Sequence, residues 1–428
     1  MRSCGLAGFL LAFFVQSAWA APTTSIRPAH RTDLPTGPLL AESTVPQVSR
    51  TIRPGLRPDF LADRPALNPG EIPTALPGFH IWIAGFKQKA VAQGISQETV
   101  DAAFLNVVYD QDIIKRDRNQ AEFSKAIWDY LDTAVSDLRV RNGRTALTRY
   151  ENTLRKVEAT YGVDKEIVVA IWGLESAYGS FRGSNKIMQS LATLAYDGRR
   201  AAFFEAQLIA ALEILDAGDT IPSNMTGSWA GAMGHTQFMP TSYLEHAVDF
   251  TGDGRRDIWS NDPTDALAST ANYLKAFGWT KDQPWGVEVQ LPTGFDYALA
   301  DRKIKKQPMT WARLGIVNMA GQPVRERAEA SILLPAGAQG PAFMIFDNFA
   351  VIERYNTADA YVIGVGHLAD RIAGQDGFQR SWPRADRTLS FSERKELQLR
   401  LTAAGYNTYG IDGRIGPKTI GAVRAYQQ

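Results

Sequence analysis

The feature that most constrains the fold of this chain is a long stretch in which apolar residues recur at helical spacing. The stretch begins near Phe79 and continues to Lys275, with amphipathic runs over 113–140 and 147–161. Apolar side chains three or four positions apart lie on one face of a helix, so the stretch predicts helices that share a core. Gly162, directly after the second run, is typical of a helix end.

Downstream of this stretch the pattern changes to short apolar runs separated by Pro and Gly. Runs at 287–291, 331–334 and 342–345 favour strands. Helical spacing returns between Ala358 and Ile372. We therefore predict a mainly α fold with a small β-containing part.

The N-terminus has the pattern of a secretory signal. Arg2 supplies a positive charge, 6–15 is an apolar run, and Ala18-Trp19-Ala20 matches a cleavage site. We predict a signal peptide at 1–20, export to the periplasm, and no lipid anchor, because Cys4 comes too early for lipid attachment. Residues 21–76 are rich in Pro, Thr, Arg and Ser and predict a flexible linker.

Composition excludes several classes of function. The 428 residues carry 46 Lys and Arg against 45 Asp and Glu, a net charge of +1, so we expect no nucleic-acid partner. After the predicted signal no apolar run could span a bilayer, so we expect no transmembrane segment. Cys4 is the single cysteine. The mature chain therefore has no disulfide, thiolate zinc site or cysteine nucleophile.

One predicted helix carries a glutamate that could act as an acid. The segment is YGVDKEIVVAIWGLESAYG, residues 161–179, with Asp164 as a plausible N-cap and Gly179 as a plausible stop. Glu175 lies near the helix end, about one turn from Ile171, Trp172 and Tyr178. An apolar neighbourhood would raise the pKa of its carboxyl, as a proton donor near neutral pH requires. A solvated glutamate beside a helix end remains the alternative reading of the helix alone.

A Gly-rich string, GSWAGAMGHTQFMP at 227–240, follows further along the chain. Ser228 and Gln237 supply neutral hydrogen-bonding groups and Trp229 supplies an aromatic face, which suits sugar hydroxyls and N-acetyl groups. No Gly-Lys-Ser/Thr follows, so the string is not a phosphate-binding loop. A tight loop between helices is the alternative.

The segment DFTGDGRRD at 249–257 resembles the start of an EF-hand loop. Oxygen-bearing side chains stand at loop positions 1, 3 and 5, with Gly at position 6. Position 12 is Ser260 instead of Glu, so Asp262 or Asp265 would have to supply the late carboxylate. Oxygen ligands favour a hard cation such as Ca²⁺ over zinc. The alternative is a surface turn without a metal.

Taken together, these strings resemble the B-type lytic murein transglycosylases, glycoside hydrolase family 103. The resemblance covers roughly 77–375 and rests on VAIWGLESAYG, GSWAGAMGHTQFMPTSY, AVDFTGDG, ANYLKAFGW and the RYN at 354–356. It implies a mainly α, lysozyme-like catalytic domain over 77–375, with a small β-containing part and Glu175 as the catalytic glutamate.

The same resemblance implies further site residues. The substrate-groove positions fall on Ser228, Gln237, Tyr273, Tyr355 and Asn356, with Tyr130 as a less secure candidate. The EF-hand-like site falls on Asp249, Thr251, Asp253, the Arg255 carbonyl and Asp265, the last if Ser260-Asn261 is an insertion. The chemistry implied requires no cofactor, and Ca²⁺ would be structural.

The C-terminal segment resembles a small helical peptidoglycan-binding domain. It spans 387–428 and contains the marks LQLRLTAAGY and IDGRIGPKT. Residues 376–386, with Gly, Pro and charges but no apolar periodicity, predict a flexible linker in front of it.

The resemblance implies cleavage of the MurNAc–GlcNAc bond of peptidoglycan with formation of 1,6-anhydromuramoyl ends. The expected partner is the peptidoglycan glycan strand, with cell-wall synthesis proteins as candidate protein partners. Two other readings stay open: a muramidase that uses water, and a peptidoglycan-binding protein without activity. A calcium-regulated binding protein would rest on the Asp249 loop alone.

Overall fold

The computed structural model describes residues 77–118, 126–325, 327–387, 389–413 and 415–427. The predicted signal peptide at 1–20 and linker at 21–76 lie outside these residues. Within the described part of the chain, no helix has both the length and the apolar character needed to cross a bilayer.

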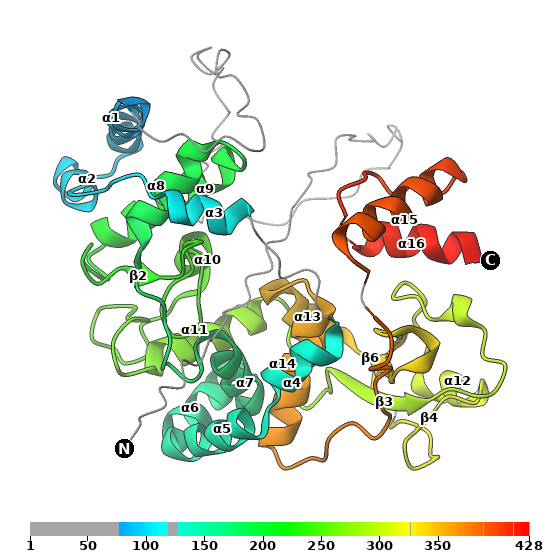
Figure 1. The fold of residues 1–428 in the computed structure, drawn as a ribbon. Coiled ribbons are helices and arrows are strands. Elements are labelled where there is room, and N and C mark those ends of the chain that lie inside the picture. The colour runs from blue at the N-terminus through cyan, green and yellow to red at the C-terminus, as the bar shows by residue number, and fades with distance from the viewer. Residues whose placement is uncertain (1–76, 119–125, 326, 388, 414, 428) are drawn as a thin grey trace, which may run out of the picture. The chain divides into compact units, whose positions relative to one another are not determined.

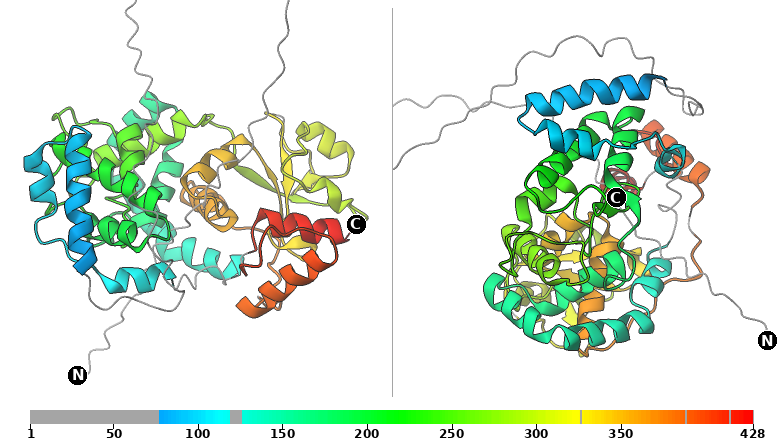
Figure 2. Two further views of the ribbon diagram at one scale, coloured as in Figure 1. Left: turned by 90° about the horizontal axis from the view of Figure 1, so that it is seen from above. Right: turned by 90° about the vertical axis from the view of Figure 1, so that its left-hand side faces the viewer.

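One group of helices contains the first helices of the chain together with two later ones. It comprises α1 (Pro77–Ala92), α2 (Gln97–Ala103), α3 (Gln111–Arg118), α8 (Ile187–Asp197) and α9 (Ala201–Asp216). The long helices α8 and α9 pack along each other, α3 packs on α8, and α2 packs on α9. Figures 1 and 2 show α1 and α2 beside them.

The second group contains α7 together with helices that pack on it or on its neighbours. It comprises α4 (Ile127–Ala134), α5 (Asp137–Arg149), α6 (Glu151–Tyr161), α7 (Lys165–Ser176), α10 (Pro240–His246), α11 (Thr264–Ala276), α13 (Asp347–Tyr355) and α14 (Asp359–Ile372). Residues 167–173 of α7 are all buried, because α5, α6, α11 and α14 pack around that helix. A helix that is apolar on every side is a core helix. A charged side chain near the end of this helix is therefore expected to be buried.

The predicted amphipathic runs are broken more often than their spacing indicates. The run at 113–140 contains α3, α4 and the start of α5, and the run at 147–161 contains the end of α5 and all of α6. Ser136 begins α5, where its side chain accepts a hydrogen bond from the Arg139 backbone N–H at 3.4 Å. Gly162 ends α6 with φ of +66°, as predicted.

The β-containing part is one antiparallel sheet in the order β4-β3-β6-β5. Its strands are β3 (Gly286–Gln290), β4 (Val317–Asn318), β5 (Ser331–Leu333) and β6 (Ala342–Ile345). The three predicted runs form β3, β5 and β6. The short β4, the helix α12 (Pro308–Arg313) and the 3₁₀ turns Tyr297–Leu299 and Gly337–Gln339 are additions.

Strand β6 separates two hydrophobic cores. Phe343 and Ile345 belong to the large core formed with the helices, whereas Ala342 and Met344 belong to a smaller core on the other side of the sheet. All four residues are buried. A strand with two buried faces reads as a continuous apolar run instead of an alternating one.

The residues predicted to be a linker, 376–386, are packed against the large core and the sheet. Phe378 and Trp382 contact the large core, and the Glu288 carboxylate accepts hydrogen bonds from the backbone N–H groups of Gln379 and Arg380, each at 2.8 Å. Residues 378–384 therefore pack against the rest of the chain, where the sequence predicted a flexible linker. Two aromatic residues among polar ones produce no hydrophobic periodicity, so the sequence pattern did not indicate this packing.

The C-terminal segment forms a pair of helices, α15 (Phe391–Ala403) and α16 (Pro417–Gln427). A capping box between Ser390 and Glu393 begins α15. The buried amide of Gln398 accepts from the Gly413 backbone N–H at 2.7 Å and donates to the Thr419 hydroxyl at 3.2 Å, which ties the turn to both helices. The predicted fold class, mainly α with a small β part and a helical C-terminal domain, is confirmed.

Candidate active site

Glu175 is the last residue but one of α7, and the backbone reverses directly after the helix. Ala177, Tyr178 and Gly179 have φ of +48°, +60° and +82°, all in the left-handed region. The helix therefore ends before the predicted stop at Gly179. Asp164 is the N-cap residue of α7 as predicted, but its carboxylate makes no capping hydrogen bond and accepts instead from the Trp279 indole N–H at 2.8 Å.

The Glu175 carboxyl is buried, with the residue 6% exposed. The Tyr361 hydroxyl donates to its Oε1 at 2.6 Å. Burial raises the pKa of Glu175 to about 8, and the hydrogen bond from Tyr361 opposes this rise. The carboxyl is therefore protonated at neutral pH, the state in which it can donate a proton.

Tyrosines from three helices interact with this carboxyl, Tyr361 through its hydrogen bond and the other two through charge. Tyr130 comes from α4, Tyr355 from the end of α13 and Tyr361 from α14. Burial is the main cause that raises the pKa of each phenol, and the charge of Glu175 is the second cause. All three hydroxyls therefore stay neutral. Trp172 and Tyr178, the predicted neighbours, pack on each other instead with ring centroids 5.8 Å apart.

The Gly-rich string forms a tight loop that presents Ser228. Strand β1 (Asn185–Lys186) pairs with β2 (Thr226–Gly227), and Gly227 also forms a bridge with Met233. The Ser228 hydroxyl accepts from the Ala232 backbone N–H at 3.0 Å. Gly227 has no room for a side chain, since a Cβ there would lie 2.0 Å from the Ala232 carbonyl oxygen.

Gln237 holds the other end of the loop. Its backbone has φ of +57°, and its side-chain amide donates to the carbonyl oxygens of Arg182 at 2.9 Å and Gly234 at 2.8 Å. The NH₂ group is therefore already committed to the protein. Donation to a ligand would require Gln237 to give up one of these bonds.

Tyr273 and Tyr355 form an aromatic wall with Phe238. The ring centroids of the two tyrosines are 5.0 Å apart, and Phe238 lies 5.8 Å from Tyr273 and 5.9 Å from Tyr355. Their hydroxyls donate to backbone carbonyls, Tyr273 to Arg354 at 2.7 Å and Tyr355 to Thr236 at 2.6 Å. The predicted groove residues on α11, α13 and the Gly-rich loop are thus brought together.

Asn356 lies at the end of α13, next to Tyr355. It is buried, and its side-chain oxygen accepts from the Ala358 backbone N–H at 3.0 Å. This bond shapes the turn into α14, whose N-cap residue is Ala358.

Tyr361 and His235 are absent from the predicted site residues. Tyr361 lies on a core face of α14, where an aromatic residue reads as packing, so no sequence signal distinguishes it. His235 lies inside the Gly-rich string. The Trp172 indole donates to its Nδ1 at 3.1 Å, so Nε2 carries the proton and donates to the Ser260 carbonyl at 2.7 Å. Burial lowers the pKa of His235, and the neutral ring fixes the loop to α7.

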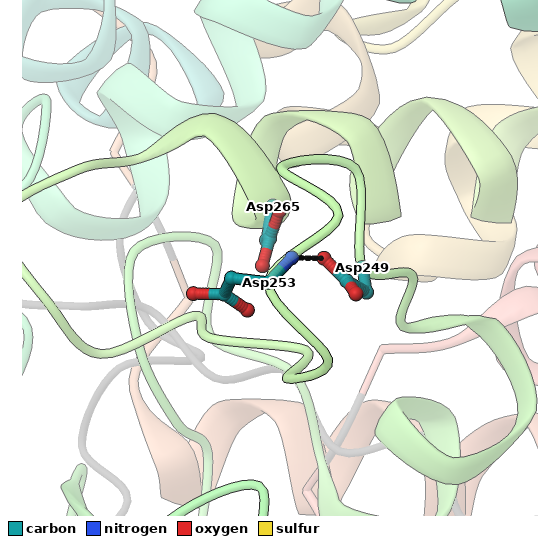
Figure 3. A group of neighbouring side chains, drawn as sticks. All are labelled: Asp249, Asp253 and Asp265. Atoms are coloured by element: carbon teal, nitrogen blue, oxygen red, sulfur yellow. Dashed lines mark hydrogen bonds between the residues drawn. The ribbon is translucent and has the colours of Figure 1, made fainter.

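The Asp249 loop gathers three carboxylates, shown in Figure 3. Oxygens of Asp249, Asp253 and Asp265 lie within 4.8 Å of one another. Asp262, the other candidate, lies at the start of α11, where it accepts from the Thr264 backbone N–H at 3.0 Å. Of the two carboxylates considered for the late position, the structure thus places Asp265 in the cluster.

Backbone N–H groups keep the loop around these carboxylates. Asp249 accepts from Gly252 and Gly254 at 2.6 and 2.7 Å, and Asp265 accepts from Thr251 at 3.0 Å. The Thr251 hydroxyl lies 3.2 Å from Asp249 Oδ1. Three convergent carboxylates in a folded loop suit a hard cation, for which the Arg255 carbonyl remains a predicted ligand.

Two family descriptions match the chain. "Transglycosylase SLT domain" matches residues 78–370, and "Putative peptidoglycan binding domain" matches residues 391–428. A curated relative, "Membrane-bound lytic murein transglycosylase B" of Escherichia coli (strain K12), is 37% identical over 251 residues, which make up 57% of this chain. The matched part is 66% of that relative's length, just under two thirds.

Solved structures are similar over most of their length. The crystal structure of SltB3 from Pseudomonas aeruginosa in complex with NAG-NAM-pentapeptide is 50% identical, with a TM-score of 0.79, and covers 82% of this chain and 94% of that one. The structure of Escherichia coli Slt35 in complex with calcium is 32% identical, with a TM-score of 0.59, and covers 68% of this chain and 92% of that one.

Proposed function

The chain belongs to the transglycosylase SLT family, and from this premise we propose that it is a lytic transglycosylase of peptidoglycan with Glu175 as its catalytic acid/base. The relatives named as lytic transglycosylases, and the one bound to NAG-NAM-pentapeptide, support this substrate. The observation that carries the catalytic assignment is the buried, protonated Glu175 under the hydroxyl of Tyr361.

In the proposed reaction Glu175 acts twice. It first donates its proton to the glycosidic oxygen between MurNAc and GlcNAc, so that this bond breaks and positive charge develops at C1 of MurNAc. As a carboxylate, Glu175 then accepts the proton of the MurNAc C6 hydroxyl while that oxygen bonds to C1. The product is a 1,6-anhydromuramoyl end, no water is consumed, and Glu175 is protonated again.

The groups that face Glu175 favour this route over the muramidase alternative. Glycosidases of the two-carboxylate type place a second carboxylate about 5–9.5 Å from the acid. Among the described residues, Tyr361 donates to the Glu175 carboxyl, the phenols of Tyr130 and Tyr355 interact with its charge, and no carboxylate contributes to its raised pKa. An attack by the substrate's own hydroxyl requires no such partner.

The other groove residues have supporting roles in this proposal. Tyr273 and Tyr355 would stack against sugar rings, Ser228 would donate its hydroxyl hydrogen, and Gln237 would hold the loop that faces the N-acetyl group. Asn356 would maintain the turn that presents Tyr355 and Tyr361. These roles follow from the contacts of each side chain and from the resemblance in the motifs.

The products of sacculus digestion test the proposed function. We expect muropeptides that end in 1,6-anhydroMurNAc, each lighter by one water than the muramidase product, because the C6 hydroxyl and not water attacks C1. Mass spectrometry of the released fragments makes this distinction. Products with reducing MurNAc ends would instead identify a muramidase, and binding to sacculi without release would identify a binding protein.

We also propose that the chain acts in the periplasm and carries two modules. The signal pattern at 1–20 and a substrate outside the cytoplasm support export. The catalytic module would span 77–375 and the peptidoglycan-binding module 387–428, with proteins of cell-wall synthesis as candidate partners.

A structural Ca²⁺ completes the proposal. Asp249, Asp253 and Asp265 would hold it with Thr251 and the Arg255 carbonyl, and its role would be to fix the loop between α10 and α11. The relative crystallised with calcium supports this choice of ion. Glu175 chemistry does not involve the ion.

Calcium is expected to raise the melting temperature of the purified protein. At a hundred times its Kd, a ligand that binds only the folded state stabilises it by about 2.7 kcal/mol. Thermal unfolding with Ca²⁺ and with chelator measures the shift. Asp253→Ala should abolish it, whereas Asp262→Ala, which removes a neighbouring carboxylate outside the cluster, should preserve it. Equal melting of the wild type with Ca²⁺ and with chelator would argue for a turn without a metal.

A further inference from the structure

The segment 378–384, which we call the strap, contacts α4 at two points one helical turn apart. The Trp382 ring lies 6.5 Å from the Trp128 ring, and the Arg384 guanidinium forms a bidentate ion pair with Asp132 at 2.7 and 2.8 Å. Residues four apart lie on the same face of a helix, so the strap holds one face of α4.

Tyr130 lies on the opposite face of α4, between the two strap contacts in sequence. It is 8% exposed; burial raises the pKa of its phenol, and a negative charge on Glu175 would raise it further. α4 approaches α14 closely here, since a Cβ on Gly364 would lie 3.1 Å from the Tyr130 ring and 3.6 Å from Ala134. A small shift of α4 would therefore move Tyr130 relative to the Glu175 carboxyl.

The other end of the strap is fixed to α14 and to the sheet. The Phe378 ring stacks on His367 of α14, with centroids 3.7 Å apart and planes at 17°, and lies 4.9 Å from the ring of Phe343 in β6. Glu288 of β3 accepts the two strap backbone N–H bonds described above. The strap thus joins α14 and the sheet to the outer face of α4.

An open groove of about 680 Å³ lies where the strap meets α4, lined by Leu131, Val135 and Ser381 among others. The strap is therefore not packed continuously against the helix. It restrains α4 through discrete contacts, chiefly those of Trp382 and Arg384, and single substitutions can remove each of them.

We propose that the strap holds Tyr130 against α14, the helix whose Tyr361 contacts Glu175, by restraining the outer face of α4, and that Trp382 and Arg384 are positioning residues for the reaction. The inference rests on the proposed function, since it assigns Glu175 the acid role. It goes beyond that function by making the segment that leads to the C-terminal helices a part of the active-site support.

Release of α4 has a defined chemical consequence. Burial is the main cause of the raised pKa of Glu175; Tyr361 of α14 donates to its carboxyl, and Tyr130 of α4 and Tyr355 of α13 interact with its charge. If α4 moves outward, water reaches the carboxyl and its pKa falls. Of the predicted groove residues Tyr130 alone lies on α4, whereas Ser228, Gln237 and Tyr273 lie on other elements, so we expect turnover to change more than substrate binding.

The test uses the full chain with Trp382→Ala or Arg384→Ala and a short soluble glycan as substrate. We expect kcat to fall about tenfold, well within the roughly 10²-fold loss that a 1 Å misplacement can cause. KM should change little, and the upper apparent pKa of the kcat profile should move down. Reversal of the ion pair with Asp132→Arg and Arg384→Asp together should restore kcat and the pKa.

Arg387→Ala is the matched control, because Arg387 forms the same kind of exposed bidentate pair with Glu393 without touching α4. It should keep the wild-type kcat and pH profile. Strap variants with wild-type kcat and pH profile would overturn the proposal, as would a loss of kcat with an unchanged pH profile and a lower melting temperature. The wild-type protein in the same assay tests the proposed function itself. If its products lack 1,6-anhydroMurNAc ends, the proposed function is refuted, whereas the proposal about the strap is tested by the variants.

Discussion

Glu175→Gln is expected to lower turnover on sacculi by ~10²–10⁴-fold or more, because the amide keeps the shape of the acid but cannot deliver a proton. The Gln side-chain oxygen can still accept from the Tyr361 hydroxyl, so folding should be nearly unchanged. Release of anhydro-muropeptides, with melting temperature measured in parallel, gives the result. Glu166→Gln on the first turn of the same helix is the control and should keep full activity. A Glu175→Gln protein with half the wild-type rate would refute the assignment.

The raised pKa of Glu175 adds a pH dependence to this result. Wild-type activity should decline as pH rises through about 8, where the buried acid loses its proton. Stability has the same sign, since a carboxyl whose folded pKa exceeds its unfolded value of 4.5 weakens folding progressively between pH 4.5 and about 8. Glutamine does not ionise, so its burial does not weaken folding as the pH rises. The variant should therefore be the more stable protein above pH 8, and an activity profile flat from about pH 5 to about pH 9 would contradict this role for Glu175.

Gly227→Ala is expected to abolish activity and to lower the melting temperature markedly. The new Cβ would lie 2.0 Å from the Ala232 carbonyl oxygen, which itself accepts the Ser228 backbone N–H at 2.8 Å. The loop can relieve this clash only by opening the bond that presents Ser228. Overpacking typically costs about 1–3 kcal/mol, and occasionally more, so we expect a loss at the upper end of this range.

Gly85→Ala is the matched control for Gly227→Ala. Gly85 is exposed within α1, and a Cβ there meets no atom within 4 Å. Alanine is preferred over glycine in a helix by roughly 0.5–1 kcal/mol, so this variant should melt slightly higher with full activity. Thermal melts and sacculus digestion of the two proteins give opposite outcomes if the clash is the cause. A fully active Gly227→Ala enzyme would show that the loop has more freedom than its contacts indicate.

Periodicity predicted the general fold because it records burial. The helical stretch and the three apolar runs identified most of the helices and three of the four strands in the sheet. It located the breaks less well, since Ser136 begins a helix in the middle of a run that stays amphipathic throughout. The strap was missed for a similar reason, because isolated aromatics such as Phe378 and Trp382 have no period.

The site could be predicted only as far as local motifs extend. Glu175 and the Gly-rich loop are visible as strings, and the resemblance supplied Tyr273 and Tyr355. The hydroxyl that contacts Glu175 comes from Tyr361, 186 positions away, and only the packing of α14 against α7 brings the two together. Gln237 shows where the motif was misleading. A neutral amide in the Gly-rich string suggested a contact with the ligand, but its N–H groups donate to backbone carbonyls of the protein.

Strand β6 has a consequence for how the chain loses its structure. Alternate residues of this strand belong to the two hydrophobic cores, so both cores depend on the same strand. If the smaller core melts, the faces of Ala342 and Met344 are exposed, and Phe343 and Ile345 lose the strand geometry that holds them among the helices. Local unfolding normally follows contiguous units with separate free energies. Here a shared strand links the two units, so that damage to the β-containing part, far from Glu175 in sequence, weakens the helices that bury it.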